Sequence, residues 1–188
     1  MNDPFYITTP IYYVNDKPHI GHAYTTILAD VLTRFNRGIG KDTFFLTGLD
    51  EHGQKVQQAA KRLGMSPKEH CDAMAPRFTD LWRKLHISND YFIRTTDDRH
   101  KKVVKKVLEV VMERGDIYQS EYEGLYSISE ERFITEKEAD NGLYGDVKKI
   151  KEKNYFFKMS KYQNQLIDHI KTNSKFIQPN HRKNEILG

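Results

Sequence analysis

Cysteine is nearly absent from this sequence, and its scarcity excludes two classes of stabilised fold. The 188 residues contain one cysteine, Cys71. Neither a disulfide framework nor a cysteine-rich zinc site can therefore form within the chain. A chain with so little cysteine fits a reducing, cytoplasmic setting. We accordingly expect the fold to rest on an apolar core.

Long hydrophobic runs are also lacking, so no membrane association is expected. No apolar stretch approaches the length that spans a bilayer. The start, MNDPFYITTP, has no basic stretch followed by an apolar run, so it does not predict a signal peptide. The net charge of +4 permits an anionic partner such as ATP or RNA without establishing one. With 38% hydrophobic and 12% aromatic residues, the composition is typical of a globular protein.

The first fifty residues alternate between strand and helix patterns. PFYITTP (4–10) and DTFFLTG (42–48) are short apolar or β-branched runs, as buried strands are. Between them, apolar residues recur at the three-to-four spacing of a helix that ends near Gly38 and Gly40. Those residues are Ile20, Ala23, Ile27, Leu28, Val31, Leu32 and Phe35. Strand, helix and strand of this length predict a βαβ unit with a parallel sheet and a right-handed crossover.

Helices are expected next, followed by a region with strand and turn patterns. Residues 53–64 are rich in helix formers, and Ser66 with Glu69 forms a capping box that opens a further helix. Residues 99–115 are amphipathic, and the pattern predicts an apolar face turned inward: Val103, Val104, Val107, Leu108, Val111 and Met112. From 116 to 159, short aromatic strands and glycine turns indicate a small β-rich insertion. A helix capped by Ser160 and the start of another helix then follow.

The lysines of helix 99–115 leave two interpretations open. Lys101, Lys102, Lys105 and Lys106 could bind the RNA backbone, or they could form the solvated face opposite the apolar stripe. Lysines on an amphipathic helix are more often the solvated face, so we favour the second interpretation.

Two histidines at the first predicted helix start are the strongest chemical signal. His19 and His22 lie at i and i+3, so they share one face of a helical turn that carries unpaired N–H groups. Gly21 between them lets a flat ligand approach the helix backbone. The pair follows a strand end, where open α/β sheets bind ligands, and it could hold a triphosphate. Histidines at such a place also act as surface caps, and a zinc pair would lack a further ligand nearby.

The segment PHIGH (18–22) resembles the HIGH motif of class I aminoacyl-tRNA synthetases, carried by His19, Ile20, Gly21 and His22. The surrounding blocks are more specific: YITTPIYYVNDKPHIGHAYTT, FFLTGLDEHGQKVQQAA, FIRTTDDRHKKVV and GDIYQSEYEGLY. Together they resemble the methionyl-tRNA synthetase family of the bacterial and mitochondrial type, over essentially the whole chain.

The resemblance implies a fold class and three regions. The class is α/β, the first half of a Rossmann-type parallel-sheet catalytic domain with a small β-rich connective insertion. Residues 1–115 would form the first half of the nucleotide-binding catalytic domain, 116–175 the connective insertion, and 176–188 the return towards a second half. A half-sheet would expose an unpaired edge and an apolar face. The chain therefore resembles an amino-terminal fragment, a truncated reading frame or one part of a split enzyme.

The resemblance also implies roles for single residues. In this family the two HIGH histidines contact ATP phosphates, so His19 and His22 would be catalytic. Asn15, His19, Gly21 and His22 would bind ATP. Asp50 matches the acid that pairs with the methionine ammonium group, and Ile11 and Tyr13 match positions that line the methionine pocket. From the residues alone, Asp50 belongs to a polar loop, and PIYYV is more often core packing.

Two segments depart from the family pattern. YSISEERF carries Ser127 and Glu130 where relatives with a zinc knuckle have cysteines, so no zinc is expected. KMSKY (158–162) resembles the start of the ATP-clamping KMSKS loop, but it stands in the return segment of the insertion. We interpret it as unrelated to ATP binding.

The function implied is that of a methionine–tRNA ligase. The methionine carboxylate would attack the α-phosphate of ATP, with Mg²⁺ accompanying the nucleotide, and methionine would then pass to tRNA(Met). The tRNA would be bound largely through parts absent here. The alternative is a non-catalytic fragment or subunit that binds ATP or methionine, or docks on a second polypeptide that completes the fold. A related HIGH-motif ligase for another amino acid is disfavoured by the quoted blocks.

Overall fold

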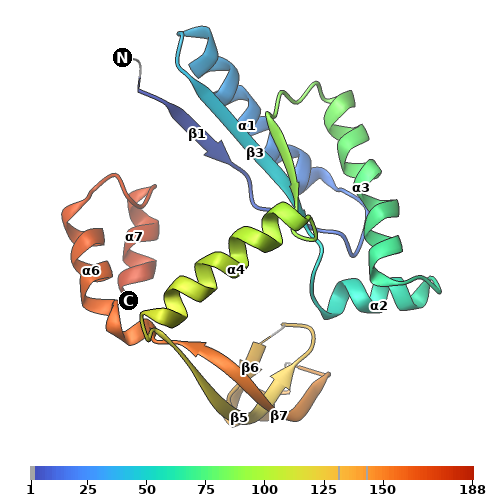
Figure 1. Cartoon of the computed structure of the whole chain (residues 1–188), viewed down its shortest axis with the longest axis vertical. Coiled ribbons are helices and arrows are strands. Elements are labelled where there is room, and N and C mark those ends of the chain that lie inside the picture. Colours follow the sequence, from blue (N-terminus) through green and yellow to red (C-terminus); the bar gives the residue numbers. More distant parts are fainter. Residues whose placement is uncertain (1–2, 131, 143) are drawn as a thin grey trace. The chain divides into compact units, whose positions relative to one another are not determined.

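The computed structural model describes residues 3–130, 132–142 and 144–188, in two compact units (Figure 1). The first unit comprises residues 1–105 and the second residues 106–188. The predicted division into 1–115, 116–175 and 176–188 stays a prediction.

The first unit is built on a four-stranded parallel sheet. Its strands are β1 (Phe5–Thr8), β2 (Tyr12–Tyr13), β3 (Thr43–Asp50) and β4 (Tyr91–Arg94). Strand β3 is central: β1 pairs with its first half, β2 with its last two residues, and β4 with its middle. Figure 1 shows β1 and β3 side by side, joined through α1 (Ile20–Gly38). The predicted βαβ unit and its parallel pairing are confirmed.

Strand β4 was not predicted, and a glycine permits its close approach to β3. A Cβ on Gly48 would lie 2.0 Å from the backbone carbonyl oxygen of Ile93. No real Cβ contact is that short, so only glycine fits between the two strands here.

Two further helices complete the core of the first unit. They are α2 (Gln54–Arg62) and α3 (Pro67–Lys84), and the predicted capping box of Ser66 and Glu69 opens α3. Buried residues from β2, β3 and these helices form one apolar cluster: Tyr12, Val14, Leu49, Val56, Cys71, Met74, Ala75, Phe78 and Trp82. Tyr12 and Leu49 of this cluster lie one residue before the ends of β2 and β3, so the cluster supports the loops that follow these strands.

Helix α1 turns its small and polar residues inward. Its buried residues are Ala23, Thr26, Ala29, Asp30, Thr33 and Asn36. Its large apolar residues are exposed, including Tyr24 (70%), Val31 (56%) and Phe35 (63%). The apolar spacing thus predicts the helix correctly, but those large side chains are not the ones that pack on this sheet.

The exposure of the apolar face of α4 (Asp98–Glu113) contradicts another prediction. The six apolar residues expected to face inward are not buried, and the helix contains no buried residue at all. Val103 is 59% exposed and Leu108 is 50% exposed. The periodicity predicts a helix with one apolar side correctly, but most of the side chains on that side are exposed.

The second unit contains the predicted β-rich insertion. Strands β5 (Ile117–Ser127), β6 (Arg132–Ile134) and β7 (Val147–Phe157) form an antiparallel sheet in the order β6-β5-β7, with α5 (Glu136–Asp140) between β6 and β7. A 3-10 turn, η1 (Met159–Lys161), then leads into α6 (Gln163–Thr172) and α7 (Asn180–Leu187). The cap prediction was wrong: Ser160 lies within η1, and the residue at the start of α6 is Tyr162.

Candidate active site

The site is formed where three parallel strands end at one edge of the sheet. Strand β2 ends at Tyr13 and leads to the histidine segment, β3 ends at Asp50, and β4 ends at Arg94. Because parallel strands share a direction, the loops that follow them meet at the same edge. The sequence-predicted residues all belong to the first unit, around β2, at the start of α1 and at the end of β3.

The two histidines cap α1 reciprocally. His19 is the N-cap residue, and its Nδ1 accepts a hydrogen bond from the backbone N–H of Gly21 at 3.1 Å. The Nδ1 of His22 accepts from the backbone N–H of His19, also at 3.1 Å. The rings stack with centroids 3.8 Å apart. Since Nδ1 is an acceptor in both rings, a neutral ring carries its proton on Nε2 and presents that N–H as its donor.

Capping and ligand binding were alternatives in the sequence, and this geometry makes them compatible. Capping uses only one nitrogen of each ring. The Nε2 donors add to the positive end of the α1 dipole at a helix start that is largely exposed. Together they form an arrangement suited to an anionic group such as a phosphate.

Aromatic packing holds His22 from behind. Its ring lies 4.6 Å from the Tyr12 ring and 5.6 Å from the Phe78 ring, centroid to centroid. Partial burial lowers the pKa of His22, and the neighbouring His19 lowers it further. Both effects favour the neutral imidazole, which agrees with the capping role of its Nδ1.

A buried histidine outside the motif fixes the loop before it. His70, on α3, is 2% exposed, and its Nε2 lies 2.8 Å from the carbonyl oxygen of Val14. Val14 is followed directly by Asn15, whose side chain is exposed. No sequence pattern singles out His70, because its partner lies 56 residues away.

Two of the three residues expected to bind methionine lie on neighbouring strands, and Ile11 directly precedes the first of these strands. Tyr13 and Asp50 are register partners in the β2–β3 pair. Paired residues of parallel strands point to the same side, so the two side chains leave the sheet together. Tyr13 is 46% exposed and Ile11 is 39% exposed, so neither is a core residue. Asp50 and Tyr13 thus lie on one side of the sheet at the strand ends, and the role of all three residues in methionine binding stays a prediction.

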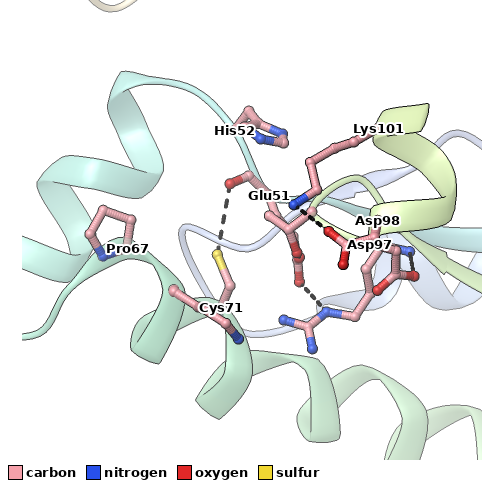
Figure 2. A pocket seen from close by; sticks show the side chains of 10 residues that line it. Glu51, His52, Pro67, Cys71, Asp97, Asp98 and Lys101 are labelled. Carbon is pink, nitrogen blue, oxygen red and sulfur yellow. Dashed lines mark hydrogen bonds and ion pairs between the residues drawn. The ribbon is translucent and has the colours of Figure 1, made fainter. Parts of the chain in front are cut away.

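The loop after β3 is held by residues that sequence reasoning missed. Glu51 is buried, and its side chain accepts hydrogen bonds from Arg94 and Thr96. These groups line a cavity of about 510 Å³. Figure 2 shows Glu51 at this cavity, with His52 and Cys71. Arg94 and Thr96 stand in the quoted block FIRTTDD. The signal that could have found them is the end of β4, a strand that was not predicted.

The described residues contain no cluster of three or more histidine, cysteine or acidic side chains placed to hold a metal ion. In the insertion, Ser127 is buried and its Oγ lies 3.0 Å from Ser129 Oγ and 3.3 Å from Asp146 Oδ1. The expectation of no zinc stays a prediction. Across the described helices, none has the length and apolar character needed to cross a membrane.

The KMSKY segment has structural contacts. Lys161 and Tyr162 both donate to the carboxylate of Asp116, at the base of the β5–β7 ribbon. Asp116 is 1% exposed. These contacts give the lysine a role within the insertion. The interpretation that the segment is unrelated to ATP stays a prediction.

Comparison with known proteins assigns the family. A family model described as tRNA synthetases class I (M) matches residues 5–143. The chain belongs to this family. Within it, the methionine–tRNA ligase of Fusobacterium nucleatum is 50% identical over 100% of this chain, which corresponds to 30% of the relative. The methionine–tRNA ligase of Clostridium tetani is 52% identical over 97% of this chain and 29% of its own length.

Solved structures of synthetases agree with this family assignment and with the fold. Mycobacterium tuberculosis methionyl-tRNA synthetase in complex with methionyl-adenylate superposes with a TM-score of 0.92 and 39% identity, over 100% of this chain and 38% of that one. An Agrobacterium radiobacter LeuRS complex, at 18% identity and a TM-score of 0.76, shares the fold. The predicted resemblance and fold class are confirmed. The chain spans about 30% of the length of the curated synthetases it matches.

Proposed function

We propose that this chain supplies the ATP- and methionine-binding part of a methionine–tRNA ligase, corresponding to its N-terminal portion. The observation that carries the proposal is the reciprocal cap of His19 and His22. It leaves two Nε2 donors at a helix start, at the sheet edge where Asp50 also lies. The M. tuberculosis structure with methionyl-adenylate, 39% identical, supports this choice of ligands.

The proposed reaction is adenylate formation by positioning and electrostatics. The methionine carboxylate attacks the α-phosphate of ATP, and pyrophosphate leaves with its bond electrons. The Nε2–H groups of His19 and His22 donate to phosphate oxygens as negative charge develops on them. Asp50 accepts a charge-assisted hydrogen bond from the methionine ammonium group, beside Ile11 and Tyr13. No side chain acts as a covalent nucleophile, because orientation of the two substrates supplies much of the acceleration.

The remaining binding assignments follow from the same segment. Asn15 and Gly21 flank the histidines, and Gly21 lets the nucleotide approach the helix backbone. Mg²⁺ would travel with the phosphates of ATP, since it keeps several waters and takes few protein ligands. Transfer to tRNA(Met) completes the proposed function, in a soluble cytoplasmic enzyme.

The test is methionine-dependent exchange of pyrophosphate into ATP. We would assay the 188-residue chain and a fusion of it to the part of the F. nucleatum relative that lies beyond the match. His19→Ala/His22→Ala and Asp50→Asn should each lower the exchange rate by about 100-fold or more in whichever protein is active. His181→Ala, at an exposed histidine of α7, is the matched control and should change nothing.

The outcomes separate the proposal from its rival. Exchange at unchanged rates in both active-site variants would refute the assigned roles. Activity only in the fusion would favour the second candidate for the isolated chain, a subunit that docks on another polypeptide. The exposed apolar faces of α1 and α4 favour that candidate specifically.

A further inference from the structure

Glu51 has an unusual position for an acidic residue. It directly follows Asp50, yet its side chain is 0% exposed. Its carboxylate accepts from Arg94 Nε at 2.6 Å, at the end of β4, and from the Thr96 hydroxyl two residues later. A carboxylate is buried in this way only when charge and hydrogen bonds compensate it.

The guanidinium group of Arg94 joins three elements. Its Nε binds Glu51 after β3, and its Nη2 lies 2.7 Å from Asp72 Oδ1 on α3. Asp72 is also paired with Lys68, at 2.6 Å on the same helix. The two acids raise the pKa of Arg94 against the opposing effect of its burial. The planar fork of arginine can serve two carboxylates at once, which lysine cannot do in this geometry.

The backbone of Glu51 is held as firmly as its side chain. Its N–H donates to Thr95 Oγ1 at 2.9 Å, and the same hydroxyl lies 3.0 Å from His52 Nδ1. Its carbonyl oxygen accepts from the Cys71 thiol at 3.8 Å, as Figure 2 shows. Every polar group of Glu51 therefore has a partner, at the end of β4, in the segment that follows β4, or on α3.

We propose that Glu51, Arg94 and Thr95 are positioning residues for methionine, because they fix the loop that aims Asp50. The inference rests on the proposed role of Asp50. Asp50 is the residue immediately before this anchored point, and its own carboxylate accepts from the backbone N–H of His52 at 3.3 Å, within the same loop. The loop is anchored to α3 and to the end of β4. It therefore holds the Asp50 carboxylate in position for the methionine ammonium group, with no reorganisation on binding.

The test measures KM for methionine and for ATP separately, in the active protein. Glu51→Gln, Arg94→Lys and Thr95→Val should each raise the KM for methionine by about tenfold and leave the KM for ATP within about twofold. Thr95→Ser keeps the hydroxyl and should restore the methionine KM. Asp80→Asn, which removes an exposed pair with Arg83 on α3, is the matched control.

A second measurement needs no activity and uses the 188-residue chain. Amide hydrogen exchange at Glu51 and His52 should quicken by about tenfold in Glu51→Gln and Thr95→Val, while the amides of α1 keep their protection. Unchanged exchange at these two amides would overturn the anchoring. Equal rises of both KM values would also overturn it, since they would show a general loss of structure.

Different results would refute the positioning residues and the proposed function on which they rest. An Asp50→Asn variant with normal methionine KM would refute the role of Asp50 itself. A strong effect of Asp50→Asn together with no effect of Glu51→Gln, Arg94→Lys or Thr95→Val would leave the function standing and remove the positioning residues.

Discussion

The imidazole of His19 lies directly against Gly21. A Cβ at Gly21 would come within 3.0 Å of His19 Cε1 and 3.1 Å of its Nδ1. That spacing is tighter than ordinary van der Waals contact, so a side chain at residue 21 would push the His19 ring aside by a few tenths of an ångström. The glycine of the motif thus positions the histidine that precedes it.

Gly21→Ala should therefore separate stability from activity. The alanine gains up to about 1 kcal/mol of helix propensity, whereas a displaced His19 ring loses a cap of about 1 kcal/mol. The free energy of unfolding should change by less than about 1 kcal/mol, while pyrophosphate exchange falls by about tenfold or more. Urea unfolding and the exchange assay measure the two quantities.

Gly38→Ala is the control for this prediction. Gly38 lies in the same helix, and nothing lies within 4 Å of the position its Cβ would take. That variant should gain about 0.4–1 kcal/mol with unchanged exchange. Equal behaviour of the two alanine variants in the exchange assay would contradict the role of Gly21.

The stability of the protein should depend on the protonation of His22. Its pKa is lowered by burial and by His19, so between the lowered value and the ordinary 6.5 the unfolded chain binds more protons. The contribution to the free energy of unfolding is therefore complete above pH 6.5 and is lost as the pH falls through the lowered pKa. Protonation also ends the acceptance by Nδ1 from the backbone N–H of His19.

His22→Gln provides the comparison, because glutamine can cap at this position but does not titrate. Urea unfolding at several pH values between about 5 and 8 should show a smaller loss of stability at low pH in the variant. An identical pH dependence in the two proteins would mean that His22 does not titrate in the way its packing implies.

The elements of the first unit were largely predictable, but their buried sides were not. The spacing of Ile27, Val31 and Phe35 specifies a helix, yet Ala29 and Thr33 are the residues that reach the sheet. Periodicity gives the presence of an apolar side and does not say which neighbour covers it. Hydrophobicity alone would assign the larger side chains to this sheet.

The site was predictable only where its residues are adjacent in sequence. His19, Gly21 and His22 form one turn, so their spacing shows their common face. Glu51 and Arg94 are 43 residues apart, and their pairing depends on β4, a strand of four residues without alternating burial. A strand so short gives no periodic signal, and the contacts made at its end stay hidden with it.

Lys161, the second lysine of KMSKY, should stabilise the insertion and take no part in ATP binding. Hydrogen bonds from Lys161 and then Tyr162 lower the pKa of the Asp116 carboxyl group. Lys161→Ala and Asp116→Asn should lower the thermal midpoint of unfolding without changing the KM for ATP. Lys158→Ala keeps the backbone hydrogen bond from Lys158 to Asp116, so it should lower the thermal midpoint less than Lys161→Ala does and leave the KM for ATP unchanged. Loss of ATP use in a folded Lys161→Ala protein would refute this interpretation.

Cys71 should be inert in the folded protein. Burial raises the pKa of its thiol to about 11, and the charge of Glu51 acts in the same direction. Only the thiolate reacts with alkylating agents, so modification by iodoacetamide near pH 8 should be at least about tenfold slower than in urea-unfolded chain. Mass spectrometry measures the modified fraction with time. Equal rates in the two states would place the thiol in solvent.

The buried Trp82 provides the protein with an intrinsic fluorescence probe. It is the single tryptophan of the chain, 3% exposed, and its ring lies 6.0 Å from that of Tyr12, which in turn contacts His22. Its indole Nε1 has no hydrogen-bond partner among the described residues. An indole in such surroundings emits at short wavelength, and a shift of the Tyr12 ring would alter its quantum yield. Fluorescence can therefore report events at the histidine pair without any added label.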